Sequence, residues 1–147
     1  MDRIMVGYDG TDSARLAVEE AAALAQGMDA DLHIVQVVID ERPRGGMAAA
    51  WVDSPMQEAA AARQQGRDEL AIEGTQHVAQ AFPDVRVHPE VLHGPPATVL
   101  VERAEHLGAD LIVVGNRRVQ GISRVLGSVA IDVLRHAHCS VYVAHTN

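Results

Sequence analysis

Five short runs of apolar residues recur along the chain, and each is bounded by glycine, proline or charged residues. Short apolar runs between turn signals are typical of β-strands. The predicted strands span residues 3–8, 32–39, 85–91, 111–114 and 140–144. The second and the fourth are apolar almost without interruption, as in strands that are covered on both faces. Pro89 inside the third indicates an edge strand, because proline cannot donate to a ladder.

Four helices are predicted between these strands from apolar residues spaced at three and four positions. They span residues 14–26, 57–81, 97–107 and 127 or 128 to 136. Ser13 is expected to cap the first helix and Gly27 to end it, while Gly108 is expected to end the third. The inward-facing residues predicted for the first two helices are Leu16, Ala17, Ala21, Leu24, Leu70, His77, Val78 and Ala81.

Strands that alternate with helices predict an α/β fold. Right-handed crossovers then give an open, five-stranded, mostly parallel sheet with helices on both faces, a Rossmann-like three-layer sandwich. Residues 40–55 follow neither pattern and are expected to form a mobile connection, and residues 1–147 are expected to form one domain. In such sheets ligands bind beyond the carboxyl ends of the strands, where the strand order reverses. The functional site is therefore expected near Asp9 and Gly115, where two of the strands end.

Charge and composition argue against several classes of function. The formal charge is -8, and all twelve basic residues are arginine. This charge argues against a nucleic-acid or anionic-membrane partner, and the lack of lysine excludes a Schiff base or a P-loop lysine. No apolar run approaches the length of a membrane span, and no basic and apolar leader precedes the first strand. We therefore expect a soluble, cytoplasmic protein without membrane insertion.

Cysteine, histidine and serine indicate no catalytic centre. The lone Cys139 is expected to be an inert core thiol. The eight histidines are scattered, and the close pair His136 and His138 lacks the further ligands of a zinc site even with Cys139. No serine stands on a Gly-x-Ser-x-Gly elbow. We predict no catalytic residue and no metal ligand.

Two loops carry residues that suit a phosphate-bearing ligand. One is Asp9-Gly10-Thr11-Asp12-Ser13, and the other runs from Gly115-Asn116-Arg117-Arg118 to Gly127-Ser128 at the start of the last helix. A helix start offers unpaired N–H groups, and glycine lets an anion approach the backbone. Each residue also has an ordinary structural role in a cap or a turn. Because all of them lie on the two loops that face the predicted crevice, the binding interpretation is favoured.

Three segments of the chain resemble the universal stress protein family. They are residues 4–13 (IMVGYDGTDS), residues 109–115 (ADLIVVG) and residues 126–130 (LGSVA) continuing to Val141-Tyr142-Val143. They follow the family's order and spacing over essentially the whole chain. The resemblance implies a sheet of the adenine nucleotide alpha hydrolase-like type, a homodimer that pairs the last strands and, in one branch of the family, ATP or another adenine nucleotide.

The last strand supports the dimer on physical grounds as well. It alternates apolar and polar positions and is expected at an edge of the sheet, where unpaired backbone groups form a template for pairing. Twofold symmetry allows this strand, from Val141 to Ala144, to pair with its own copy in an antiparallel arrangement.

The chain departs from the family's ATP-binding pattern, which is Gly-x-x-Gly, nine residues, then Gly-Ser or Gly-Thr. Gly115 and Gly127-Ser128 match it, but Arg118 replaces the second glycine and only eight residues separate it from Gly127. Arg118 either fills the phosphate pocket and excludes a triphosphate, or its guanidinium replaces the missing N–H donors by a charge-assisted contact. Retained binding is favoured because Asp9 and the pair at the helix start are present.

The resemblance suggests a role for each residue of the predicted site. Asp9 would lie near the ribose or the adenine, the backbone of Val38 at the adenine edge, and Gly115 beneath the phosphates. The full set of predicted nucleotide-binding residues is Tyr8, Asp9, Val38, Val114, Gly115, Asn116, Arg118, Gly127, Ser128 and Val129.

Three functions are compatible with this site. The first is a stress-response or signalling module that binds ATP, with or without Mg²⁺, or cyclic AMP. The second is a dimeric module of the same fold that binds no nucleotide and acts through protein partners. The third is an enzyme, either a slow ATPase or a nucleotidyl-transfer relative of the same architecture, for which the sequence offers no clear general base.

Overall fold

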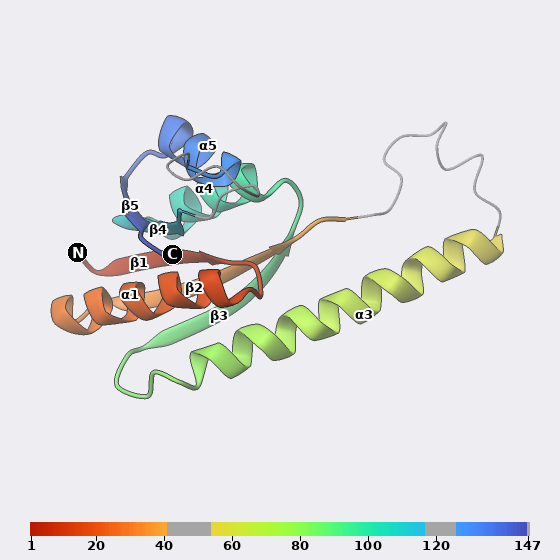
Figure 1. Cartoon of the computed structure of the whole chain (residues 1–147), viewed down its shortest axis with the longest axis horizontal. Helices are drawn as coiled ribbons and strands as arrows, with labels where there is room; N and C mark the ends of the chain where they lie inside the picture. The colour runs from red at the N-terminus through yellow and green to blue at the C-terminus, as the bar shows by residue number, and fades with distance from the viewer. Residues whose placement is uncertain (41–53, 117–125, 147) are drawn as a thin grey trace.

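The computed structural model describes residues 1–40, 54–116 and 126–146, and five strands alternate with four helices along them (Figure 1). The predicted connection at residues 40–55 lies almost wholly outside these ranges, as does Arg118. The strands are β1 Arg3–Tyr8, β2 Asp31–Val38, β3 Val87–His93, β4 Leu111–Gly115 and β5 Ser140–Ala144. The helices are α1 Asp12–Met28, α3 Ser54–Ala79, α4 Pro96–Leu107 and α5 Ser128–His136.

The five strands form one parallel sheet in the order β3-β2-β1-β4-β5. The chain first builds outward from β1 to β2 and β3, and it then returns to the other side of β1 with β4 and β5. The strand order therefore reverses between β1 and β4, which confirms the predicted α/β fold. Pro89 lies on the edge strand β3, as predicted.

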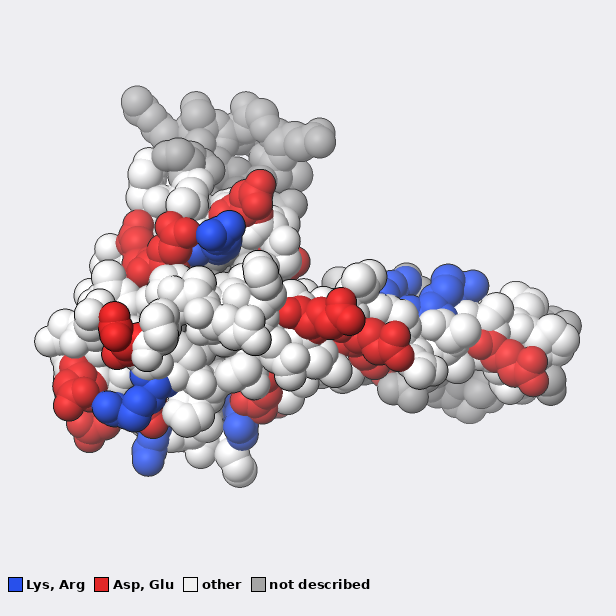
Figure 2. Space-filling view, turned by 90° about the horizontal axis from the view of Figure 1, so that it is seen from below, with Lys and Arg blue, Asp and Glu red and all other residues white. Residues whose placement is uncertain are grey.

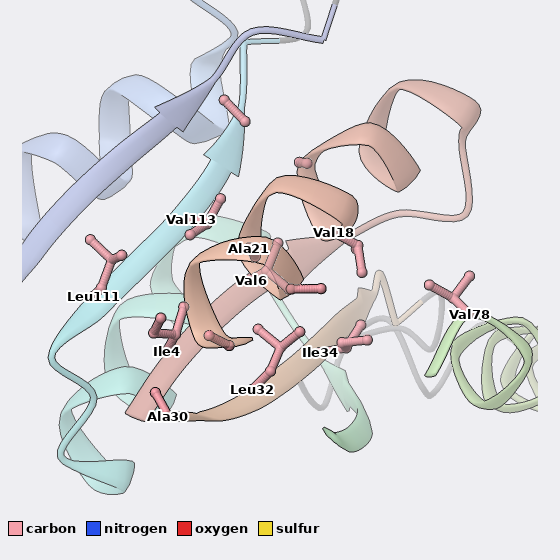
Figure 3. Packing of buried hydrophobic residues seen from close by; sticks show 14 residues of the cluster. Ile4, Val6, Val18, Ala21, Ala30, Leu32, Ile34, Val78, Leu111 and Val113 are labelled. Atoms are coloured by element: carbon pink, nitrogen blue, oxygen red, sulfur yellow. The ribbon is translucent and has the colours of Figure 1, made fainter. Parts of the chain in front are cut away.

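Alternate residues of the central strands enter two separate hydrophobic clusters. Ile4 and Val6 of β1 point to the face that α1 and the end of α3 cover, and Figure 3 shows them beneath α1 with Leu32 and Ile34. Met5, between them, points to the opposite face, which α4 and α5 cover. All three β1 side chains are fully buried. Burial on both faces explains why this strand reads as a continuous apolar run.

The predicted cap and stop of the first helix are wrong. Thr11 caps α1, since its hydroxyl oxygen accepts a hydrogen bond from the Ala14 N–H at 3.1 Å. Gly27 stays within the helix, which ends at Met28, and the C-cap residue Asp29 has a left-handed conformation (φ 51°). Aspartate tolerates this conformation better than most residues because its short polar side chain can bond locally. The predicted stop of the third helix at Gly108 and the predicted start of the last helix at residue 127 or 128 are confirmed.

Several predicted inward-facing positions are also wrong. Ala17, Ala21 and Val78 are buried and Leu24 packs against the core, but Leu16, Leu70, His77 and Ala81 are exposed. Leu70 is 71% exposed while its neighbour Ala71 is 5% exposed. The helix faces lie about one residue away from the predicted ones, because small alanines, rather than the largest apolar residues, pack closely on the sheet.

The helix α3 extends well beyond the sheet. Its 26 residues span about 39 Å at 1.5 Å per residue. The space-filling view shows it as an arm that projects from the body of the molecule (Figure 2). Acidic side chains are spread over body and arm on this face, and among the described residues the basic ones lie between them in small groups.

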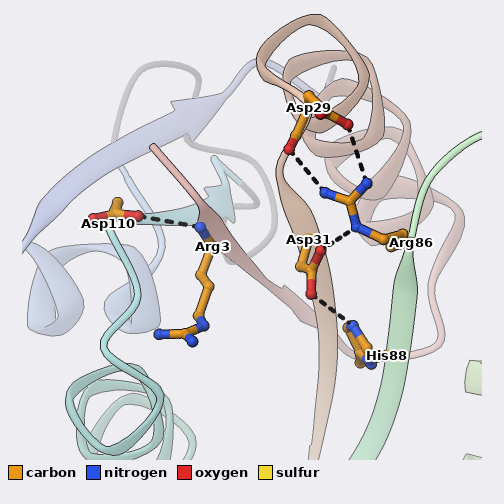
Figure 4. Close-up of polar contacts among 6 residues, drawn as sticks. All are labelled: Arg3, Asp29, Asp31, Arg86, His88 and Asp110. Atoms are coloured by element: carbon orange, nitrogen blue, oxygen red, sulfur yellow. Dashed lines mark hydrogen bonds and ion pairs between the residues drawn. The ribbon is translucent and has the colours of Figure 1, made fainter.

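Polar side chains join the segments at the amino ends of the strands (Figure 4). The Arg86 guanidinium bonds to the carboxylates of Asp29 and Asp31, and Asp31 also lies 3.1 Å from His88 Nε2. The Asp110 carboxylate accepts hydrogen bonds from the N–H groups of Asp2 and Arg3. These contacts lower the pKa of Asp31, chiefly through Arg86, and the pKa of Asp110, chiefly through the Asp2 N–H. The amino end of the sheet is therefore tied together by its own charged groups.

Candidate nucleotide-binding site

A cavity of about 640 Å³ opens at the carboxyl ends of the strands, at the point where their order reverses. Such a volume suits a ligand of nucleotide size. Strand ends and helix starts from both halves of the sheet line it. These residues are Gly7, Tyr8, Asp9, Ser13, Ala14, Val35, Val37, Ile39, Pro96, Leu100, Val114, Gly115, Gly127, Ser128, Val129 and Ala130.

The side of the cavity at β2 is an apolar wall. Val35, Val37 and Ile39 point to the same side because they are every second residue, and Leu100 of α4 lies with them. Leu100 also approaches β1 closely: a Cβ atom built on Gly7 would lie 3.1 Å from its Cδ1. Glycine at this position therefore lets α4 and β1 close the base of the cavity. The wall can receive a flat, apolar ring.

Asp9 supplies an acceptor at the end of β1. Its Oδ1 accepts hydrogen bonds from the Thr11 N–H at 3.0 Å and from the Thr11 hydroxyl. Gly10 turns the chain between them with a positive φ of 85°. The carboxylate is thus fixed at the rim by the turn that also starts α1. Tyr8 lies beside it, and burial, followed by the Asp9 charge, raises the pKa of the Tyr8 phenol.

The start of α5 supplies hydrogen-bond donors to the cavity wall. Gly127 is the N-cap, and within the described part of the chain no side-chain hydrogen bond caps the helix. The first N–H groups of a helix have no partner within it, and the residues that carry them in α5, Ser128, Val129 and Ala130, line the cavity. These groups carry partial positive charge, which favours an anion such as phosphate.

A buried polar network stands behind the cavity. Asn116, directly after β4, is 9% exposed, and its Oδ1 accepts bonds from the N–H and the hydroxyl of Thr146 at 2.9 and 2.8 Å. Ser13, on the cavity wall, donates to Thr146 Oγ1 at 2.7 Å. The Asn116 Nδ2 lies 3.2 Å from His145 Nδ1. This network joins the start of α1, the end of β4 and the segment after β5.

Known proteins with similar sequences point to one family. A profile described as the Universal stress protein family matches residues 1–145. The chain is 34% identical to the universal stress protein MJ0531 of Methanocaldococcus jannaschii, over 96% of this chain and 80% of that one. It is also 34% identical to the universal stress protein Rv1636 of Mycobacterium tuberculosis, over 97% and 95%. The chain belongs to the universal stress protein family.

A solved structure agrees with this assignment. A universal stress protein crystallised in complex with cAMP superposes on this one with a TM-score of 0.67 and 28% identity, covering 99% of this chain and 98% of that one. The resemblance to the universal stress protein family and the predicted fold class are both confirmed.

The cavity of this universal stress protein brings together seven of the ten predicted site residues. These are Tyr8, Asp9, Val114, Gly115, Gly127, Ser128 and Val129. Val38 and Asn116 do not line it, and Arg118 lies outside the described residues. Val38 has its side chain on the opposite face of β2, and its carbonyl accepts the Gly94 N–H at 3.1 Å. The role suggested for its backbone stays a prediction.

Sequence reasoning missed the apolar wall and the residues that α4 contributes. The wall carries a usable signal, because Val35, Val37 and Ile39 alternate with the side chains of the opposite face. Pro96 and Leu100 carry no such signal, since their place on the cavity depends on how α4 crosses the sheet.

No described helix is both long enough and apolar enough to cross a membrane.

Proposed function

We propose that this universal stress protein binds an adenine nucleotide in the cavity between β1 and β4. The arrangement of its walls supports the proposal. An acceptor at Asp9 and N–H donors at the start of α5 both line the cavity, together with the apolar wall of β2. A nucleotide carries the matching groups: an apolar base, a sugar with hydroxyl donors and an anionic phosphate.

ATP is the proposed ligand and cyclic AMP the alternative. The cAMP-bound relative supports an adenine nucleotide of some kind, because it matches nearly the whole chain at 28% identity. The N–H groups at the start of α5 would hold the phosphates. Asp9, on the cavity rim at the end of β1, would face the sugar.

Equilibrium dialysis with ATP and with cyclic AMP tests the proposal. Gly127→Arg should abolish binding, because it puts a long side chain on the cavity wall without straining the backbone, which has φ -61° there. Gly27→Arg is the matched control, since a Cβ atom at Gly27 would meet nothing within 4 Å and the residue lies on α1 outside the cavity. Absence of nucleotide binding to the unmodified chain at millimolar concentration would favour a module that acts only through protein partners.

We also propose that the protein is a homodimer through β5. This strand pairs with β4 on one side and ends the sheet on the other, and such an edge is a template for a second copy. Val143→Pro should give a monomer in size exclusion with light scattering. A folded variant that remains dimeric would contradict this mode of pairing.

A further inference from the structure

The hydroxyl of Ser13 is held by a chain of hydrogen bonds whose direction can be worked out. The chain runs from Ser13 on the cavity wall through Thr146 to Asn116. The Thr146 backbone N–H can only donate, and it points to the Asn116 side chain at 2.9 Å. The Asn116 atom that it meets must therefore be the oxygen, which fixes the orientation of this amide.

This orientation decides where the hydroxyl protons lie. Because Asn116 Oδ1 only accepts, the Thr146 hydroxyl, 2.8 Å away, must donate its single proton to it. Thr146 Oγ1 then has only lone pairs left for Ser13, so Ser13 must donate its own proton at 2.7 Å. Asn116 and Thr146 are 9% and 5% exposed, so water offers them little competition.

We infer that Ser13 acts only as a hydrogen-bond acceptor toward the cavity, and that its partner there is a hydroxyl of the ligand's sugar. This inference rests on the proposed nucleotide-binding function. A serine with a free hydroxyl could donate to a phosphate oxygen, but Ser13 has no proton left for it. Its lone pairs, with the Asp9 carboxylate of the same turn into α1, disfavour an anion and favour an O–H donor.

The position of Ser13 points to the sugar rather than the base. The apolar wall that suits a base is formed by β2, on one side of β1. Ser13 is hydrogen-bonded to Thr146, which packs on β4, on the other side of β1 from β2. A Cβ atom built on Gly115 of β4 would lie 3.4 Å from Thr146 Cγ2. A ligand with its base on the wall and its phosphate at α5 has its sugar between them, near Ser13 and Asp9.

Calorimetric titration of the full chain with ATP and with 2′,3′-dideoxy-ATP tests the inference. The unmodified protein should bind the dideoxy analogue about 10-fold more weakly, since acceptors at the sugar lose their donors. In Ser13→Ala this ratio of affinities should fall by about 5-fold. Thr146→Val should lower the ratio as well, because it removes the acceptor that holds the Ser13 proton, and the hydroxyl is then no longer fixed with its lone pairs toward the sugar. Thr146→Ser keeps the hydroxyl chain and should keep the ratio.

The ratio of the affinities for ATP and for 2′,3′-dideoxy-ATP separates a role of Ser13 at the sugar from general damage to the fold. Thr98→Val is the matched control, because Thr98 is exposed on α4 outside the cavity, and it should leave the ratio unchanged. If Thr146→Val fails to fold, as judged by circular dichroism, the ratio measured for Ser13→Ala with ATP and 2′,3′-dideoxy-ATP still tests the inference. A ratio that Ser13→Ala does not change overturns the inference while ATP binding stands. If the unmodified protein binds neither nucleotide, the proposed function fails and the inference fails with it.

Discussion

The two ends of the sheet differ in how their polar groups are used. At the amino ends of the strands, Arg86 bonds to Asp29 and Asp31, and Asp110 accepts the N–H groups of Asp2 and Arg3. At the carboxyl ends, acceptors and helix N–H groups meet around a cavity of about 640 Å³. Charged groups that pair with one another hold a fold together, whereas polar groups arranged around a hollow suit a ligand. Changes at the two ends should therefore affect different properties.

Of the changes that compare the two ends, the largest effect on ligand affinity is expected from a matched pair of charge removals. Asp9→Asn keeps an oxygen for the Thr11 N–H but removes the charge at the cavity, and ATP affinity should fall about 10-fold because hydrogen bonds to charged groups are the stronger ones. Asp110→Asn makes the same change at the amino end and should leave affinity unchanged. Calorimetric titration of both variants measures the contrast. Equal losses of affinity would show that the two ends do not differ in this way.

A substitution in the turn from β3 into α4 tests whether the stability of the fold depends on backbone geometry at the carboxyl end of the sheet. Gly94 has a φ of 131°, and a Cβ atom there would lie 2.9 Å from Val99 Cγ2. Gly94→Ala should lower the free energy of unfolding by about 1–3 kcal/mol. Gly66→Ala in α3, where a Cβ atom meets nothing within 4 Å, should raise it by about 0.5–1 kcal/mol. Urea denaturation compares the two, and a destabilisation of the same size in both would refute the assignment of strain to Gly94.

A smaller effect is expected from pH at His33, which shares a face of β2 with Val35 and Val37 but lies outside the cavity, nearer the start of the strand. His33 stacks on His88 with ring centroids 4.7 Å apart, and burial, followed by the His88 charge, lowers the pKa of His33. The unfolded chain then binds a proton more readily than the folded one, so stability falls as the pH drops below the unfolded value of about 6.5. The loss continues until the pH passes the lower pKa of the folded state.

Thermal melts at about pH 7.5 and about pH 5.5 measure this effect. His33→Phe keeps an aromatic ring in the stack but cannot titrate, so its melting temperature should fall less on acidification than that of the unmodified protein. His106→Phe, at an exposed site on α4, is the control and should keep the full dependence on pH. The same fall in both variants would rule out His33 as the source.

The periodicity of the chain was enough to predict most of the fold. Strands β1 and β5 begin and end where the apolar runs do, and β3 lies two residues later than predicted. Helix ends and faces were less predictable. Gly27 was predicted to end the first helix but lies within it, and Leu70 was predicted to face the core but is 71% exposed. Local pattern identifies an element, while its exact face depends on what packs against it.

For the candidate site, the sequence by itself determined the two loops, because strands of a parallel sheet end at a common edge and Asp9 and Gly115 follow two of them. Only the tertiary structure decided which other residues join them. Leu100 reaches the cavity through the crossing of α4, and Thr146 meets Asn116, 30 residues away in the chain, through the pairing of β5 with β4. Such contacts depend on the positions of whole elements in space, and no short window of sequence contains them.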